Sequence, residues 1–144
     1  MWLKDDKLWT PPEDFDPKEV YGFVYLITNL KTNKKYVGKK FFWSSKTLPI
    51  TKTRKRRKKL LVESDWKNYW GSNKWLQQDV KELGEDNFKR EILHLCRTKG
   101  ECAYLEAKEQ FDRDVLLTED YYNGIIAVKC NATSVKKLFT LTEE

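Results

Sequence analysis

Gly22-Phe-Val-Tyr25-Leu-Ile27 and Lys35-Tyr36-Val-Gly38-Lys-Lys40 are the two stretches that decide the fold of this chain. Each is short and rich in aromatic and β-branched residues, which is typical of a β-strand. The segment between them, Thr28–Lys34, is polar and contains two asparagines, which accept turn conformations that most residues avoid. The sequence therefore predicts a β-hairpin that brings Tyr25 and Tyr36 onto neighbouring strands.

The overall composition predicts one compact domain inside the cell. A length of 144 residues suits a single domain, and 40% hydrophobic residues with 14% aromatics are sufficient for a core. No apolar run approaches the roughly 18 residues of a membrane span. The stretch Met1–Lys7 lacks the apolar centre of a signal peptide, so we expect a cytoplasmic protein without a membrane partner.

Cysteine and histidine usage excludes several classes of chemistry. The three cysteines are an odd number without a CxxC pair, so neither a disulfide framework nor a zinc site is expected. His94 is the only histidine, which excludes a histidine metal cluster. It falls in the predicted strand around residues 88–95, where we interpret it as an ordinary strand residue.

Positive charge is concentrated in one segment. The net charge is +6, and such a balance suits an anionic partner. The stretch 46–59 contains eight basic residues and no acid: Lys46, Lys52, Arg54, Lys55, Arg56, Arg57, Lys58 and Lys59.

The remaining patterns predict a small α+β domain with a three-stranded antiparallel or mixed sheet flanked by helices. Prolines and acids indicate an irregular N-terminal arm over residues 1–20, with at least one of Trp2 and Trp9 packed on the domain. The domain itself spans residues 21–128, and residues 129–144 form a tail. Its expected elements are a long basic connection after the hairpin, a helix over 73–83 capped by Ser72, a strand over 88–95, a helix over 100–115 opened by Thr98-Lys-Gly-Glu101, a turn at 121–124 and a short strand over 125–128.

This order of elements resembles the GIY-YIG nuclease family across roughly residues 20–126. Val24-Tyr25 is similar to the first half of the motif that names the family, and Tyr36-Val37-Gly38 is similar to the second half. Further similarities are Tyr69-Trp70-Gly71-Ser72, Asn87-Phe88, Glu91-Ile92-Leu93, Tyr104-Leu105-Glu106 and Asn123-Gly124. The resemblance implies a metal-dependent endonuclease, of the stand-alone phage or mobile-element type, that hydrolyses DNA phosphodiesters with Mg²⁺ or Mn²⁺; a phage-encoded protein would act in the host cytoplasm.

The resemblance also implies roles for individual residues. Tyr25 and Tyr36 would position or activate the attacking water, and a glutamate on the second helix would hold the metal. Glu106 and Glu109 are both candidates for that glutamate. At about 100° per residue, Glu106 borders the apolar face of the helix whereas Glu109 points away from it, so Glu106 is favoured.

The catalytic arginine of the family has no clear counterpart. The usual spacing after Gly38 reaches Lys46, so the candidates are Arg57 and, after it, Arg56 or Arg54. The other basic residues are expected to contact DNA phosphates: Lys39, Lys40, Arg54, Lys55, Arg56, Lys58 and Lys59.

Two positions depart from the family pattern, and they bear on the expected geometry of the site more than on the fold. Phe23 stands where the first glycine of the motif would align, and Ile126 stands where an asparagine is often found, for which Asn123 is the candidate substitute. The alternatives to a nuclease are a non-catalytic basic module that binds nucleic acid through its cations and exposed tryptophans, and a compact basic interaction protein.

Overall fold

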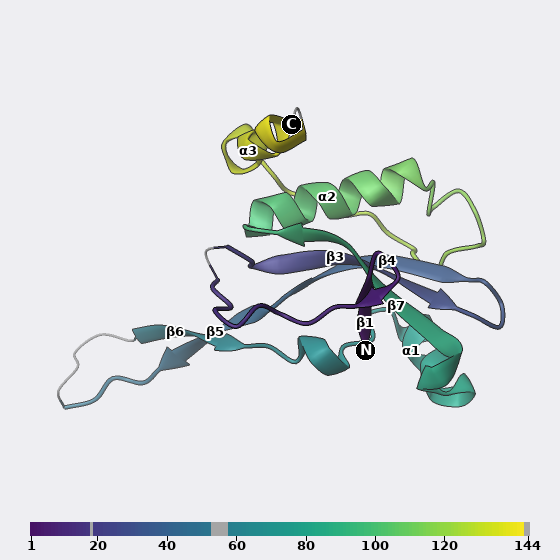
Figure 1. Ribbon diagram of the computed structural model, residues 1–144, viewed down its shortest axis with the longest axis horizontal. Coiled ribbons are helices and arrows are strands. Elements are labelled where there is room, and N and C mark those ends of the chain that lie inside the picture. The colour runs from purple at the N-terminus through teal and green to yellow at the C-terminus, as the bar shows by residue number, and fades with distance from the viewer. Residues whose placement is uncertain (18, 53–57, 143–144) are drawn as a thin grey trace.

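The protein is a mixed α+β domain, seen here in a computed structural model that describes residues 1–17, 19–52 and 58–142 (Figure 1). Its main sheet has five strands in the order β2-β1-β7-β3-β4, and two further strands, β5 and β6, form a separate sheet. The elements are β1 (Trp2–Lys4), β2 (Lys7–Leu8), β3 (Gly22–Asn29), β4 (Lys35–Phe41), β5 (Trp43–Leu48), β6 (Lys58–Glu63), η1 (Trp66–Asn68), α1 (Lys74–Leu83), η2 (Glu85–Asn87), β7 (Phe88–Cys96), α2 (Lys99–Asp112) and α3 (Ala132–Thr142).

The predicted hairpin is confirmed as β3 and β4. The two strands are antiparallel, and their register places Tyr25 opposite Gly38 and Tyr36 opposite Ile27. Asn29 shapes the turn between them, because its side-chain oxygen accepts hydrogen bonds from the backbone N–H groups of Lys31 and Thr32. β3 lies between β4 and β7 and is buried along its whole length, as its apolar sequence requires.

Both predicted helices are present, with small differences at their ends. α1 begins one residue later than predicted, because Asn73 rather than Ser72 accepts the N–H groups of Trp75 and Leu76. Thr98 caps α2 as predicted, by accepting the N–H of Glu101. α2 ends at Asp112 instead of continuing to residue 115.

Two apolar layers hold the sheet. On one side α2 packs on Val24, Leu26 and Val37. Figure 1 shows this helix above the sheet. The other side is an aromatic core that gathers the N-terminal residues, η1 and α1, with Phe23 and Phe42 fully buried. This division matters for the site, because β4 forms the edge of the sheet and can present side chains from both faces.

The prediction of three strands is wrong: the sheet has five, because the N-terminal segment is not an irregular arm throughout. β1 pairs parallel to β7, with Trp2 opposite Arg90, and β2 pairs with β1. Trp2 drives this pairing, since its side chain is 2% exposed and its indole N–H donates to the carbonyl of Trp66 at 2.8 Å. The expectation that at least one N-terminal tryptophan packs on the domain is thereby confirmed.

Three other segments differ from the prediction. The basic connection contains the β5–β6 ribbon, in which six residue pairs from Trp43↔Glu63 to Leu48↔Lys58 face each other. Residues 125–128 form no strand, because Asn123 meets β4 through its side chain instead of its backbone. The tail beyond residue 131 forms α3, which packs on α2. None of the helices described is both long and apolar enough for a membrane span.

Candidate functional site

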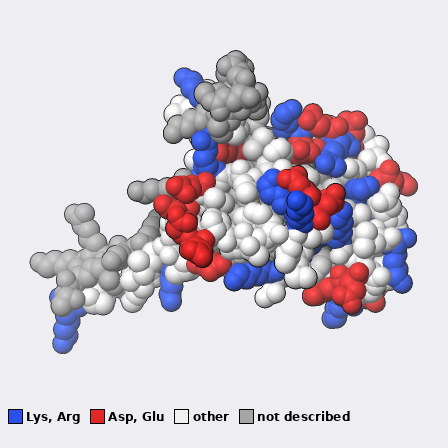
Figure 2. Space-filling model, viewed as in Figure 1, with Lys and Arg blue, Asp and Glu red and all other residues white. Residues whose placement is uncertain are grey.

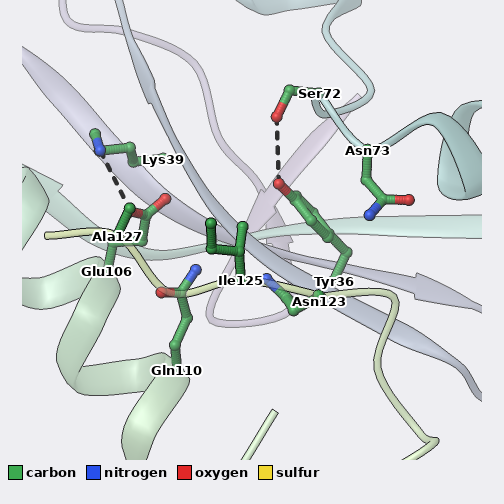
Figure 3. A pocket seen from close by; sticks show the side chains of 10 residues that line it. Tyr36, Lys39, Ser72, Asn73, Glu106, Gln110, Asn123, Ile125 and Ala127 are labelled. Carbon is green, nitrogen blue, oxygen red and sulfur yellow. Dashed lines mark hydrogen bonds and ion pairs between the residues drawn. The ribbon is translucent and has the colours of Figure 1, made fainter. Parts of the chain in front are cut away.

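A polar pocket of about 330 Å³ opens beside the edge strand β4. Its walls come from four separate parts of the chain: β4, the turn before α1, the middle of α2 and the segment after Tyr122 (Figure 3). The lining residues are Tyr36, Lys39, Ser72, Asn73, Glu106, Gln110, Asn123, Gly124, Ile125 and Ala127. The fold thus brings together residues that are up to 91 positions apart in the sequence, from Tyr36 to Ala127.

Tyr36 presents its hydroxyl to this pocket. The hydroxyl shares a hydrogen bond with the Ser72 hydroxyl at 3.3 Å, which fixes the direction of the phenol (Figure 3). Burial raises the pKa of Tyr36 above its ordinary value, although the bond to Ser72 works in the opposite direction. The phenol therefore keeps its proton at neutral pH and can donate a hydrogen bond to a group in the pocket.

Tyr25 lies behind Tyr36 and does not line the pocket. Its side chain is 1% exposed, and its ring contacts those of Tyr36 and Tyr69 at centroid distances of 6.1 and 6.0 Å. Burial raises the pKa of Tyr25 well above the ordinary value, and the neighbouring tyrosines add to this rise. Tyr25 is hydrogen-bonded to Tyr69, so the two tyrosines named by the motif occupy different environments.

The rings of both motif tyrosines lie close to Gly38 on β4. A Cβ atom at this position would lie 2.6 Å from Cζ of Tyr25 and 2.9 Å from Cε2 of Tyr36. Any side chain here would therefore push both rings out of place. The glycine of the second half-motif is required by this close approach rather than by an unusual backbone conformation.

The Gly38→Ala variant tests this packing. We expect it to lower the free energy of unfolding by about 1–3 kcal/mol, the range for overpacking in a well-packed region, and to reduce any activity of the pocket. Urea denaturation of the purified variant measures the change. Gly124→Ala is the matched control, because a Cβ atom there meets nothing within 4 Å. Equal stabilities of both variants would contradict the packing argument.

Glu106 reaches the pocket from α2. Its side chain is 13% exposed, and one carboxylate oxygen lies 3.3 Å from the ammonium of Lys39 on β4. Burial raises the pKa of the Glu106 carboxyl, while Lys39 opposes this rise. In the pocket, the Glu106 carboxylate is therefore paired with the Lys39 ammonium, in a region from which water is partly excluded.

Glu109, the alternative to Glu106, belongs to another cluster. It bonds to His94 at 2.8 Å and to Arg113 at 2.9 Å, and it does not line the pocket. The hydrogen bonds from Arg113 and His94 hold the pKa of Glu109 below its ordinary value in spite of partial burial. The structure therefore places only one of the two candidate glutamates beside Tyr36.

Asn123 and Gln110 fix the pocket wall by bonding to the backbone of β4. The side chain of Asn123 accepts the N–H of Val37 at 3.0 Å and donates to its carbonyl at 2.8 Å, as a neighbouring strand would. Gln110 donates to the same carbonyl at 3.1 Å. Because Val37 follows Tyr36 directly, these bonds hold the tyrosine in its position.

Several lining residues are not predicted as site residues by the sequence. Ser72 is predicted as a helix cap, while Asn73 and Gln110 have no predicted role in the site. Gly71 gave a usable signal, since its φ of 84° requires a glycine and creates the turn that aims Ser72 at Tyr36.

The candidate DNA contacts are distributed unevenly. Lys39 lines the pocket, whereas Lys40 points to the opposite face of β4, where it pairs with Asp65 at 2.7 Å and lies 4.2 Å above the Tyr69 ring. Arg54, Lys55, Arg56 and the candidate catalytic Arg57 lie outside the described residues. Lys58 and Lys59 are placed in β6, without a description of their side chains.

Comparison with known proteins decides the family. The family described as "Putative endonuclease segE, GIY-YIG domain" matches residues 2–126. The chain belongs to the GIY-YIG family. It is 35% identical over 106 residues to a protein of Enterobacteria phage T4 named "Putative endonuclease segE", a match that covers 72% of this chain but only 40% of the phage protein. No solved structure matches significantly.

The pocket of this GIY-YIG domain fits a cation held by a single carboxylate. Across the described ranges, no three His, Cys, Asp or Glu side chains gather closely enough to hold a metal ion together. Mg²⁺ needs no such cluster, because it keeps several of its waters and commonly binds one or two carboxylates. Glu106 provides one carboxylate, and the Lys39 ammonium beside it shows that the pocket favours positive charge at this oxygen.

Proposed function

We propose that this GIY-YIG domain is a divalent-metal-dependent endonuclease that hydrolyses DNA phosphodiester bonds. The observation that supports it is the meeting of Tyr36, Lys39 and Glu106 around one pocket, built from elements that belong to the family match. A carboxylate for a metal, a protonated phenol and an ammonium are groups that hydrolysis of a phosphodiester can use.

Each residue has a distinct part in this proposal. Glu106 would hold Mg²⁺ or Mn²⁺, and the bound cation would supply Lewis-acid stabilisation of the charge that develops on the phosphate. Tyr36 would donate its hydroxyl hydrogen to the attacking water or a phosphate oxygen. Lys39 would leave Glu106 when the metal binds and pair with a phosphate oxygen of the substrate.

Tyr25 has a supporting part. It is too deeply buried to touch DNA, so it would hold Tyr36 through ring contact and anchor Tyr69 through its hydrogen bond. Ser72 would act on the other side by orienting the Tyr36 hydroxyl. Arg57, Arg56 and Arg54 stay predicted candidates for a second cation at the phosphate.

Plasmid nicking tests the function as a whole. Supercoiled plasmid incubated with the protein and Mg²⁺ or Mn²⁺ is expected to become nicked or linear, because the cation and Glu106 act together at the phosphate. Excess EDTA is expected to abolish the reaction, and added Mg²⁺ is expected to restore it. Retarded but uncut DNA with every metal would instead favour the non-catalytic binding module.

A further inference from the structure

The β5–β6 ribbon stands apart from the body of the protein, as the left side of Figure 1 shows. It is a two-stranded sheet, and the described residues along it, Ser44–Thr47 and Leu60–Val62, are exposed. Leu60, Leu61 and Val62 are 38%, 49% and 38% exposed. An isolated two-stranded hairpin is marginally stable in water, and exposed apolar side chains on it indicate a surface that a partner covers.

The ribbon is nevertheless firmly attached beside the candidate site. β4, which carries Tyr36 and Lys39, leads into β5 through Phe42, whose side chain is fully buried. At the base of the ribbon, the Trp43 indole donates to the carbonyl of Val20 at 3.0 Å. Ser64, which follows β6, donates its hydroxyl to the carbonyl of Phe41 at 2.6 Å. The direction of the ribbon is thus coupled to the strand that forms the pocket.

The charges of the ribbon fit a polyanion. From Ser44 through Val62 the sequence contains eight basic residues and no acid. The neighbouring N-terminal segment contains the acids Glu13, Asp14, Asp16 and Glu19. Figure 2 shows red groups where the ribbon joins the body. The ribbon sequence is therefore basic, whereas acidic residues gather where the ribbon joins the body.

The register assigns the two faces of the ribbon. Directly paired residues share a face, so Ser44, Lys46, Leu60 and Val62 lie on one face. Trp43 belongs to the opposite face, and its ring contacts that of Phe15 in the acidic N-terminal segment at 4.9 Å. The face with Lys46 thus points away from these acids. Ser44 also lines a cleft together with Lys39, which lines the pocket as well.

The dimensions of the ribbon select duplex DNA. Two strands about 4.8 Å apart, with their side chains, fill a width that the major groove of about 12 Å admits and the minor groove of about 6 Å does not. β5 has six residues and is therefore about 20 Å long, which corresponds to about six base pairs. The apolar side chains of the ribbon can contact thymine methyl groups, which are exposed only in the major groove.

We propose that the ribbon face of Ser44, Lys46, Leu60 and Val62 docks in the major groove of double-stranded DNA, within about one helical turn of the phosphate at the pocket. This inference rests on the proposed nuclease function and specifies its substrate as a duplex rather than a single strand. The pocket supplies the chemistry, and the ribbon holds the duplex across it.

Binding of a 40-base-pair duplex, measured by fluorescence anisotropy in EDTA, tests the docking surface without cleavage. The Lys46→Gln/Lys52→Gln variant is expected to lose two phosphate contacts. The slope of log K against log salt would then fall by about 1.8, and the affinity at 0.15 M salt would fall about 30-fold. Lys81→Gln/Lys108→Gln is the matched control, because these exposed lysines lie on α1 and α2. It is expected to bind like the unmodified protein.

Two further measurements identify the partner. The unmodified protein is expected to bind the duplex at least tenfold more tightly than the single strand of the same sequence. Methyl green, which occupies the major groove, is expected to compete, whereas netropsin, which occupies the minor groove, is not. Unchanged affinity and slope in the Lys46→Gln/Lys52→Gln variant would overturn the proposal. A change in its sedimentation without a change in DNA binding would overturn it too and identify the ribbon as a contact between copies of this chain.

The failure of this inference can be separated from the failure of the proposed function. If the plasmid is never cut although the ribbon variant loses duplex affinity, the docking surface stands and the nuclease proposal fails. If the plasmid is cut and the ribbon variant binds duplex DNA like the control, the nuclease proposal stands and the docking surface is wrong.

Discussion

The Glu106→Gln variant is expected to cleave DNA about 10³-fold more slowly than the unmodified protein in single-turnover reactions. Glutamine keeps the shape of the side chain but removes the charge that would hold the metal. A Lewis acid contributes several kcal/mol at the transition state, and each 1.36 kcal/mol corresponds to a factor of about ten in rate. Binding of uncut DNA in EDTA should persist or become tighter, because Lys39 loses its carboxylate partner Glu106 and is released for phosphate.

Glu109→Gln is the matched control on the same helix. Its carboxylate holds His94 and Arg113 outside the pocket, so its loss should affect stability and leave the cleavage rate within a few-fold of normal. Loss of cleavage in Glu109→Gln with normal cleavage in Glu106→Gln would overturn the assignment of Glu106. Loss in both variants would indicate that α2 as a whole, rather than one carboxylate, supports the site.

Local sequence signals predicted the elements that local interactions determine. The hairpin follows from alternating aromatic and β-branched residues around an asparagine turn, and Asn29 closes that turn as the pattern requires. The Thr98 cap likewise depends on residues three positions apart. These contacts join residues that are close together in the sequence, so a local sequence pattern is sufficient to predict them.

Long-range contacts explain what the sequence did not predict. β1 forms because the Trp2 side chain packs among Phe23, Tyr25 and Trp66. The pattern of the first 20 residues does not indicate these distant contacts. Asn123 replaces a backbone strand by pairing with Val37 from 86 positions away. The β5–β6 ribbon is not predicted for another reason. Its charged segment with Pro49 does not show the alternation of apolar and polar residues that is typical of a half-buried strand.

Residues of the candidate site could be predicted where a motif names them, but not where burial decides their position. Tyr36 and Glu106 were identified from the family pattern and the phase of the helix, and the structure places both at one pocket. The same motif treats Tyr25 and Tyr36 as equals, but their exposures differ. The positions of the two strands in the sheet explain this difference, because Tyr25 lies on the interior strand β3 in the aromatic core, whereas Tyr36 lies on the edge strand β4 beside the pocket.

The difference in burial leads to unequal effects for the two tyrosines. Tyr36→Phe is expected to fold normally and to lose roughly 10²–10⁴-fold in single-turnover rate, because the hydroxyl that faces the pocket acts on water or phosphate. Tyr25→Phe removes a buried hydroxyl that bonds to Tyr69. It should lower the free energy of unfolding by about 1–2 kcal/mol and reduce the rate less than tenfold.

Tyr21→Phe separates chemistry from packing in this series. Tyr21 packs on Phe41 at a centroid distance of 5.3 Å and lies outside the pocket, so its variant should match the unmodified protein in rate. Cleavage at saturating protein isolates the chemical step, and urea denaturation of each variant reports the packing. A near-normal rate for Tyr36→Phe would leave β3 and β4 as scaffold only and would favour the non-catalytic binding module. A rate loss in Tyr25→Phe as large as in Tyr36→Phe would mean that the Tyr25–Tyr69 bond, rather than the exposed phenol alone, sets the geometry of the reaction.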